Sequence, residues 1–304
     1  MFNEASNFVK GVDTSLAVIL GISLFFLIGI TVVMIYFVFR YHKSRNPKAT
    51  NIAYNHKLEV LWTVIPTILV LIMFYYGWAG FKPMREVPDD AMVVKAHGQM
   101  WSWSFEYDNG KRSQDLVVPV GKAVKLELIS HDVLHSLYIP AYRIKEDVIP
   151  GVDNYMWFIA QKEGSFHILC AEYCGQRHAY MMSKLEAVPE DQYKDWYVNE
   201  LGVSKDPPGL AILKQNACIS CHSIDGTTLV GPTFKGIWAR EEVIIRDGEE
   251  VNITVDKDYL RKSLNEPNAE IVKGYNKGLM ISYKDLVSEE DLDKIIEYLK
   301  TLNE

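Results

Sequence analysis

Two long uncharged apolar runs near the N-terminus constrain this chain more than any other feature. They cover residues 16–39 and 60–81, and neither contains a charged side chain. A helix over the first run is ~36 Å long, which exceeds the ~30 Å hydrocarbon core of a bilayer. A signal peptide has a shorter apolar region and ends in small residues, whereas Tyr36, Phe37 and Phe39 close this run. The runs therefore predict two membrane spans, with a pair of buried core helices as the alternative.

The distribution of basic residues predicts which way the spans are oriented. The loop between the runs carries five Lys and Arg residues, whereas Lys10 is the only basic residue before the first run. The positive-inside rule places this loop in the cytoplasm. Both termini, and everything after about Lys82, are then expected on the periplasmic side of the cell (inner or plasma) membrane.

Length and charge narrow the classes of function. The chain has 304 residues, which predicts about two domains with an appendage. Its formal net charge is −7, whereas nucleic-acid binders depend on a basic surface. We therefore expect the lipid bilayer, and no nucleic acid, among its partners.

Between residues 91 and 188 the pattern changes to short apolar or alternating runs separated by turns. Asp108-Asn109-Gly110 is a hairpin signal, and no helix-length periodic segment interrupts the runs. The pattern predicts an all-β Greek-key sandwich or barrel. The runs that read as strands are residues 91–107, 115–130, 134–140, 154–160 and 164–174.

Metal-binding side chains cluster in one loop of this region. Cys170 and Cys174 are followed by His178 and Met181, and His135 lies upstream. Thiolate and thioether ligands with imidazole favour copper, and a mononuclear blue-copper site uses only one thiolate. The second cysteine therefore favours two copper ions bridged by two sulfurs, and we expect no disulfide. A Cys2His2 zinc site and a disulfide remain the alternatives.

A second cofactor motif lies near the C-terminus. Cys218-Ile-Ser-Cys221-His222 is the C-x-x-C-H pattern of c-type haem attachment, in which both cysteines form thioethers and the histidine binds iron. A redox-active disulfide would need a thioredoxin-like βαβ context, which the pattern lacks. The sixth iron ligand should be a Met or His further along the chain. Met280 is the only such residue after His222.

The residues around this motif have the pattern of a small helical domain. Asp206-Pro207-Pro208-Gly209 predicts a stiff linker, and residues 210–217 are compatible with a helix. Asp247-Gly248 predicts a hairpin between two strand-like runs. Ser288 is a helix N-cap before an amphipathic closing helix.

The copper motif carries a family resemblance. The loop from Cys170 to Met181 reads C-x-E-x-C-G-x-x-H-x-x-M. With His135 upstream, it resembles the dinuclear copper (CuA) domain of subunit II of haem–copper cytochrome c oxidases. The resemblance implies that Cys170 and Cys174 bridge both copper ions, that His135 and His178 each bind one, and that Met181 is an axial ligand.

The same resemblance implies roles for three further residues. The backbone carbonyl of Glu172 would bind copper, and its side chain would bind Mg at the boundary with subunit I. Trp101, in an aromatic strand, would be the point where electrons enter, and packing on a sheet face is the alternative. Glu59 would lie at the mouth of a proton path into subunit I, although an acid there is ordinarily a solvated helix-end residue.

Resemblance covers essentially the whole chain. The C-terminal segment resembles class I cytochrome c and the haem domain fused to subunit II of bacterial caa-type oxidases. The expected fold class is a two-helix transmembrane hairpin, then an all-β cupredoxin-like Greek-key domain, then an all-α class I cytochrome c domain. We assign these to residues 1–88, 89–188 and 209–304, with a linker at 189–208.

The resemblance implies a respiratory electron relay. Electrons would enter at one covalent haem c and pass through CuA to subunit I, which reduces O2 to water with proton pumping. The implied partners are subunits I and III, with a soluble cytochrome c or a quinol-oxidising complex as donor. The alternatives are the electron-receiving subunit of a CuA-containing nitric-oxide reductase and a membrane-anchored copper chaperone, which would have no use for haem.

Overall fold

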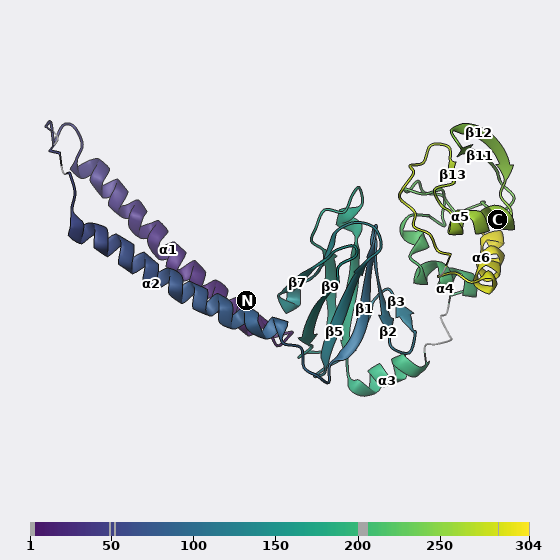
Figure 1. Ribbon diagram of the computed structural model, residues 1–304, viewed down its shortest axis with the longest axis horizontal. Helices are drawn as coiled ribbons and strands as arrows, with labels where there is room; N and C mark the ends of the chain where they lie inside the picture. Colours follow the sequence, from purple (N-terminus) through teal and green to yellow (C-terminus); the bar gives the residue numbers. More distant parts are fainter. Residues whose placement is uncertain (1–3, 49, 52, 200–205, 285, 304) are drawn as a thin grey trace.

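Three parts follow one another along the long axis of the molecule: a helical hairpin, a β-domain and a smaller C-terminal domain (Figure 1). The computed structural model describes residues 4–48, 50, 51, 53–199, 206–284 and 286–303. The order of the three parts confirms the predicted fold class, and the helical C-terminal domain contains a small three-stranded sheet in addition.

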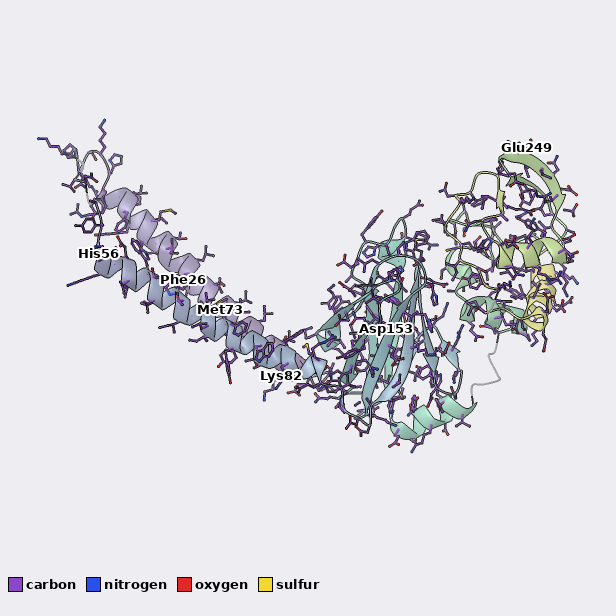
Figure 2. All side chains as sticks on the ribbon, in the orientation of Figure 1. Phe26, His56, Met73, Lys82, Asp153 and Glu249 are labelled. Carbon is purple, nitrogen blue, oxygen red and sulfur yellow. The ribbon has the colours of Figure 1, made fainter. Side chains whose placement is uncertain are left out.

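The hairpin consists of α1 (Val9–Arg40) and α2 (His56–Phe81). Both predicted apolar runs lie within these helices, which are long and apolar enough to cross a membrane. Their most apolar stretches have no buried side chains, and Figure 2 shows Phe26 and Met73 midway along the hairpin. Exposed apolar surface of this extent indicates contact with lipid.

Contacts at the base of the hairpin fix the β-domain to it. The Asp13 carboxylate in α1 pairs with the Arg143 guanidinium at 3.0 Å, and Asp13 is only 1% exposed. The Phe8 ring packs edge-on against Trp157, with ring centroids 5.0 Å apart. Trp157 Nε1 also donates to the carbonyl of Pro83 at 3.1 Å. Several independent contacts therefore set the position of the β-domain relative to the helices.

The β-domain consists of two five-stranded sheets. The strands of the first sheet are β1 (Met92–Gln99), β2 (Ser102–Tyr107), β3 (Arg112–Ser113), β5 (Ala123–Ser130) and β8 (Asn154–Ile159). Those of the second are β4 (Leu116–Pro119), β6 (His135–Ile139), β7 (Ile144–Val148), β9 (Gly164–Cys170) and β10 (Met182–Val188). The strand orders are β3-β2-β1-β5-β8 and β4-β10-β9-β6-β7. The β1–β5 and β4–β10 pairs are parallel and the other neighbours antiparallel.

Inward-facing side chains of both sheets form one core. Along β1 the buried positions alternate with more exposed ones, as expected for a strand with a single face in the core. Apolar burial of this kind is the main stabilising contribution to such a domain. The largest fully buried apolar side chains include Trp103, Phe105, Leu126, Leu137, Phe158, Ile168 and Leu185.

Two of the predicted strand runs divide in the structure. Residues 91–107 turn at Met100 and Trp101 to give β1 and β2, and residues 115–130 give β4 and β5 in different sheets. The hairpin predicted at Asp108-Asn109-Gly110 is present between β2 and β3, with Gly110 at φ +81°. Strands β7 and β10 were not predicted, because charged residues interrupt their apolar pattern. In the fold, hydrogen bonds with the backbones of neighbouring strands hold both segments as strands despite these residues.

The prediction of a linker over residues 189–208 is wrong for its first half, where the structure has helix α3 (Glu190–Asn199). Tyr193 and Trp196 of α3 pack on the β-domain, and the Trp196 ring meets Tyr107 edge-on at 5.0 Å. Aromatic residues three positions apart lie on the same helix face. This spacing was the available signal for an amphipathic helix, and the polar composition of the segment obscured it.

The C-terminal domain combines helices with a small sheet. The closing helix has a complete capping box, in which Ser288 Oγ accepts from the Asp291 backbone N–H at 3.1 Å. A Cβ at Gly209 would lie 2.2 Å from the Lys294 carbonyl oxygen, so only glycine permits the helices to cross this closely. The helices are α4 (Pro208–Gln215), α5 (Lys257–Asn265) and α6 (Glu289–Thr301). The sheet is ordered β12 (Glu249–Thr254), β11 (Glu241–Arg246) and β13 (Glu270–Val272), and it contains the predicted hairpin.

Candidate metal centre and cofactor cavity

The structure brings the five predicted donor side chains of the metal site together. Cys170 ends β9, Cys174 lies in the following loop, and their sulfurs are 3.8 Å apart. Cys170 Sγ is 3.9 Å from Nδ1 of His135, which begins β6. Cys174 Sγ is 3.5 Å from His178 Nδ1 and 3.7 Å from Met181 Sδ. The segment 170–181 is called the copper loop below.

The donor set fits soft metal ions better than a disulfide. All four cysteines lie in described segments, and none of them forms a disulfide. The 3.8 Å between Cys170 and Cys174 is far above the ~2.05 Å of a disulfide bond. Met181 and His135 are fully buried, so the thioether faces the thiols rather than solvent. A thioether among thiolates and imidazoles suits copper, whereas zinc sites use Cys, His and carboxylate.

Glu172 presents its main chain and its side chain to different surroundings. Its carbonyl oxygen lies 3.2 Å from Cys170 Sγ, within the donor cluster. Its carboxylate is 42% exposed and lies 3.7 Å from Lys145 Nζ. The carbonyl is therefore available to a metal ion in the cluster, and the carboxylate to a group outside it.

Asp132 is a functional residue that the sequence reasoning missed. Its Oδ1 accepts from His135 Nε2 at 2.8 Å, and its Oδ2 accepts from the Met100 backbone N–H at 2.6 Å. Burial opposes protonation of His135, but hydrogen bonds with Asp132 and Cys170 raise its pKa to about 9. Metal-binding histidines commonly have such a carboxylate partner. The acid three residues before His135 was the available signal.

The two thiols of the cluster differ in acidity. Burial opposes ionisation of Cys170, but hydrogen bonds from His135 and the backbone lower its pKa to about 7. Burial and the neighbouring Cys170 charge raise the pKa of Cys174 to about 12. The metal-free pair therefore holds one thiolate near neutral pH, and binding of a metal by both sulfurs releases the second proton.

Trp101 lies against the copper loop. Its side chain is 4% exposed, and Nε1 donates to the carbonyl of Cys174 at 3.1 Å. The predicted packing role and the predicted role in electron transfer are thus compatible, because the indole is both buried and bonded to a cysteine of the cluster.

Glu59 lies far from this cluster, in the first turn of α2 at the loop end of the hairpin, where Figure 2 labels His56. Its Oε1 accepts from the Asn55 backbone N–H at 3.3 Å, and Oε2 is 3.4 Å from His56 Nδ1. These contacts satisfy a free backbone donor at the helix start.

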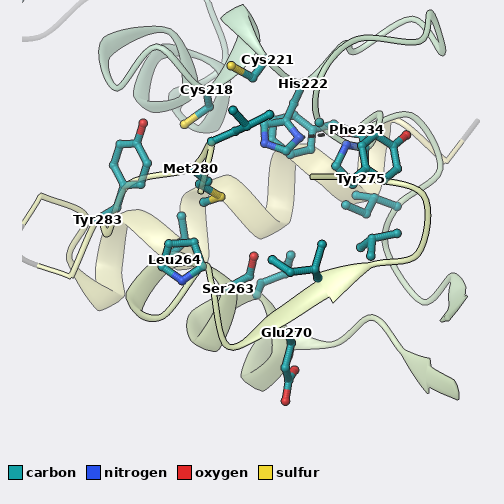
Figure 3. A pocket seen from close by; sticks show the side chains of 18 of the residues that line it. Cys218, Cys221, His222, Phe234, Ser263, Leu264, Glu270, Tyr275, Met280 and Tyr283 are labelled. Atoms are coloured by element: carbon teal, nitrogen blue, oxygen red, sulfur yellow. Dashed lines mark hydrogen bonds between the residues drawn. The ribbon is translucent and has the colours of Figure 1, made fainter. Parts of the chain in front are cut away.

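A cavity in the C-terminal domain gathers the predicted haem-binding residues. Figure 3 shows Cys218, Cys221, His222 and Met280 around it. Most of the lining of this cavity is apolar. Apolar cavities with a few polar groups are typical of cofactor sites. The segment 218–222 is called the haem loop below.

The local fold holds His222 in one orientation. Its Nδ1 bonds to the Pro232 carbonyl at 2.7 Å, which leaves Nε2 for an iron ion, and its ring stacks on Phe234 with centroids 4.6 Å apart. A Cβ at Gly231 would lie 2.5 Å from His222 Cε1, so glycine is required beside the ring. Burial lowers the pKa of His222, which keeps the imidazole neutral, as a metal ligand must be.

Arg240 provides an independent test of whether haem fits. It lines the cavity, and among the described residues its buried Nε has no hydrogen-bond partner. Its other nitrogens contact the Lys235 carbonyl at 3.3 Å and Glu242 at 2.5 Å. A buried unpaired guanidinium nitrogen fits a ligand with carboxylate groups, which haem has. Sequence reasoning did not single out Arg240, because nothing local marks it.

Comparison with known families finds three matches along the chain. Residues 1–77 match the transmembrane domain of cytochrome c oxidase subunit II, residues 111–188 match its periplasmic domain, and residues 208–303 match cytochrome c.

Individual proteins of known identity agree with these family matches. Cytochrome c oxidase subunit 2 of Alkalihalophilus pseudofirmus is 34% identical over 93% of this chain and 85% of its own length. The corresponding protein of a Bacillus species (strain PS3) is 33% identical over 82% of this chain and 75% of its own length. The solved periplasmic domain of subunit II of cytochrome oxidase from Bradyrhizobium japonicum is 34% identical. The matched region covers 36% of this chain and 94% of the solved Bradyrhizobium chain, with a TM-score of 0.35.

Proposed function

The chain belongs to the cytochrome c oxidase subunit II family and carries a cytochrome c domain. From this premise we propose that it takes up electrons at a covalent haem c and passes them through a dinuclear copper centre to a catalytic subunit. The protein is a membrane-bound subunit of an oxidoreductase. In this proposal the catalytic subunit reduces O2 to water and pumps protons, and no O2 binds to the chain described here.

The copper loop and His135 would hold two copper ions. Cys170 and Cys174 would supply thiolates to the pair, His135 and His178 imidazole nitrogens, and Met181 a thioether. The carbonyl of Glu172 would be the remaining ligand. The short distances among these donors support the assignment. A copper pair supplies one-electron transfer, and the surrounding residues hold the donors in place and keep water away.

The haem would be attached through Cys218 and Cys221 and ligated by His222 and Met280. Each cysteine would supply the thiol for one thioether link to the haem. Burial raises the pKa of both thiols, that of Cys218 to about 12. Ligation of the iron by both His222 and Met280 would suit electron transfer rather than O2 binding.

Further assignments concern the assembled oxidase. The copper and haem domains and both termini would face the periplasm, because basic residues are concentrated in the loop between the spans. The exposed Glu172 carboxylate would bind Mg at the boundary with subunit I, and Glu59 would lie at a proton path into it. Subunit III, and a soluble cytochrome c or a quinol-oxidising complex as donor, would complete the set of partners.

The single observation that carries the proposal is the convergence of two thiols, two imidazoles and a thioether in one cluster, three of whose members are buried. Metal analysis of the purified, fully loaded chain should give two copper atoms for each haem iron. Its optical spectrum should combine haem c bands with a near-infrared copper band. Zinc, or fewer than two coppers per iron, would contradict the copper pair. Absence of haem would favour a copper chaperone instead.

A further inference from the structure

The copper loop and the haem loop are joined by a direct hydrogen bond. Nη1 of Arg177 donates to the backbone carbonyl of Ser220. Arg177 immediately precedes His178, and Ser220 immediately precedes Cys221. Arg177 and Ser220 also line one small pocket together with Trp101. One hydrogen bond therefore connects the neighbours of a proposed copper ligand and a proposed haem attachment residue.

A second polar contact joins the β-domain and the C-terminal domain at a different point. Gln99 Nε2, at the end of β1, donates to the Tyr283 hydroxyl at 3.1 Å, and that hydroxyl donates to the Asn216 carbonyl at 3.2 Å. Gln99 and Met100 also form part of the wall of the haem cavity. The β-domain therefore covers one side of the cavity in which haem would lie.

Apolar contacts also join the two domains. Cys221, Val230 and Leu279 of the C-terminal domain pack against the core of the β-domain, which includes Trp101. Exclusion of water strengthens a polar contact within such an interface and raises the cost of losing it. Arg177 is half-buried, and its guanidinium lies 5.3 Å from the centroid of the exposed Tyr180 ring.

We propose that Arg177 is a positioning residue that holds the haem domain in electron-transferring contact with the copper loop. The inference rests on the proposed function, in which one electron leaves the reduced haem iron and reduces the copper pair, with no proton or atom transferred. A guanidinium donor gives a charge-assisted hydrogen bond, stronger than a neutral one. Electron tunnelling slows steeply as a gap widens, so a looser junction transfers electrons more slowly even when both cofactors are intact.

The test uses the full chain in detergent, loaded with haem and copper. Three variants are compared with the unmodified chain: Arg177→Gln removes the charge, Arg177→Lys keeps it on a different head group, and Lys184→Gln removes an exposed charge elsewhere on the same domain. A flash with a ruthenium photoreductant reduces the haem, and absorbance follows its re-oxidation by copper. Spectra and metal-to-iron ratios establish that each variant is fully loaded.

Arg177→Gln is expected to slow electron transfer at least tenfold, with copper and haem contents unchanged. Arg177→Lys should recover part of the rate, and Lys184→Gln should leave it within twofold. Tyr283→Phe, which removes the hydroxyl of the second contact, should slow transfer severalfold. A fully loaded Arg177→Gln chain that transfers electrons within twofold of the normal rate would overturn the inference.

Hydrogen–deuterium exchange gives a readout that does not depend on electron transfer. Backbone amides of the haem loop should exchange severalfold faster in Arg177→Gln than in the unmodified chain or in Lys184→Gln. Unchanged exchange would overturn the docking role of Arg177. An unmodified chain that takes up haem and copper but exchanges no electron between them would instead overturn the proposed function on which the inference rests.

Discussion

His135 Nε2 donates a hydrogen bond to Asp132 Oδ1 at 2.8 Å, so the ring nitrogen that faces Cys170 Sγ, 3.9 Å away, is Nδ1. The carboxylate thereby selects the tautomer and the orientation that a metal ion on the Cys170 side requires. Asp132 also accepts from the Met100 backbone N–H at 2.6 Å, which ties the copper site to the turn that carries Trp101.

The first prediction concerns this pair. Asp132→Asn should weaken copper binding about 10- to 100-fold, because an amide in this position no longer fixes the imidazole as a carboxylate does. Competition with a copper chelator of known affinity measures the change. Asp153→Asn, at an exposed position of the same domain, is the control and should bind copper normally. Equal affinity in the two variants would show that Asp132 does not orient His135.

The second prediction concerns Gly231. A methyl group there would lie 2.5 Å from His222 Cε1, so Gly231→Ala must displace the imidazole or the backbone, at a cost of about 1–3 kcal/mol. The amount of covalent haem per chain should fall severalfold, measured from the alkaline pyridine spectrum. Gly77→Ala, which adds a methyl group into open space in α2, should leave haem content unchanged. Normal haem content in Gly231→Ala would contradict the packing argument.

The third prediction concerns Met280. Met280→Leu removes the cavity-wall thioether that is proposed to bind the iron, and should convert the iron from six- to five-coordinate. The reduction potential should fall by roughly 0.1 V or more, since axial ligands tune haem over ~0.8 V. Redox titration and electron paramagnetic resonance measure both changes. Met182→Leu, at a 56% exposed position, is the matched control. A low-spin spectrum and unchanged potential in Met280→Leu would assign the ligand elsewhere.

The fourth prediction concerns the pH dependence of His97. Burial and the neighbouring His131 lower its pKa to about 4, and Glu106 opposes this shift while Arg112 and Lys95 add to it. The folded state binds this proton less readily than the unfolded state does. The free energy of unfolding is therefore not reduced by His97 above pH 6.5. It should fall by about 2–3 kcal/mol as the pH drops from 6.5 to 4.

Two measurements check this pH dependence. Nuclear magnetic resonance of the histidine-labelled chain gives the pKa of His97 directly. Thermal unfolding of the His97→Gln variant should lose part of the pH dependence between 6.5 and 4. His167→Gln, at an exposed position on β9, should retain it. A measured pKa of 6.5 or higher for His97 would refute the prediction.

Local spacing explains why the candidate donor residues of both sites could be identified from the sequence. Cysteine, histidine and methionine are uncommon, and Cys170, Cys174, His178 and Met181 lie within one short loop, so no tertiary information was needed to group them. The haem loop is likewise defined within five consecutive residues. The alternating pattern and the turn signals of the β-domain were sufficient to predict that it is all-β, although they did not show where β1 ends and β2 begins.

The residues that support these donors could not be predicted in the same way. Arg177 meets Ser220 across 43 positions and a domain boundary, and no local pattern anticipates such a contact. Arg240 acquires significance only because the cavity leaves its Nε without a partner among the described residues. Helix α3 was missed because its polar residues outweighed its aromatic ones, whereas in the fold those aromatic residues pack on the β-domain.

The burial of Trp101 bears on where electrons would enter in the proposed relay. Because the indole is only 4% exposed and lies beneath the copper loop, a mobile carrier in solution has no direct access to it. Such a carrier would have to reduce the haem first, so the copper pair would receive electrons only through the haem and not directly from reductants in solution.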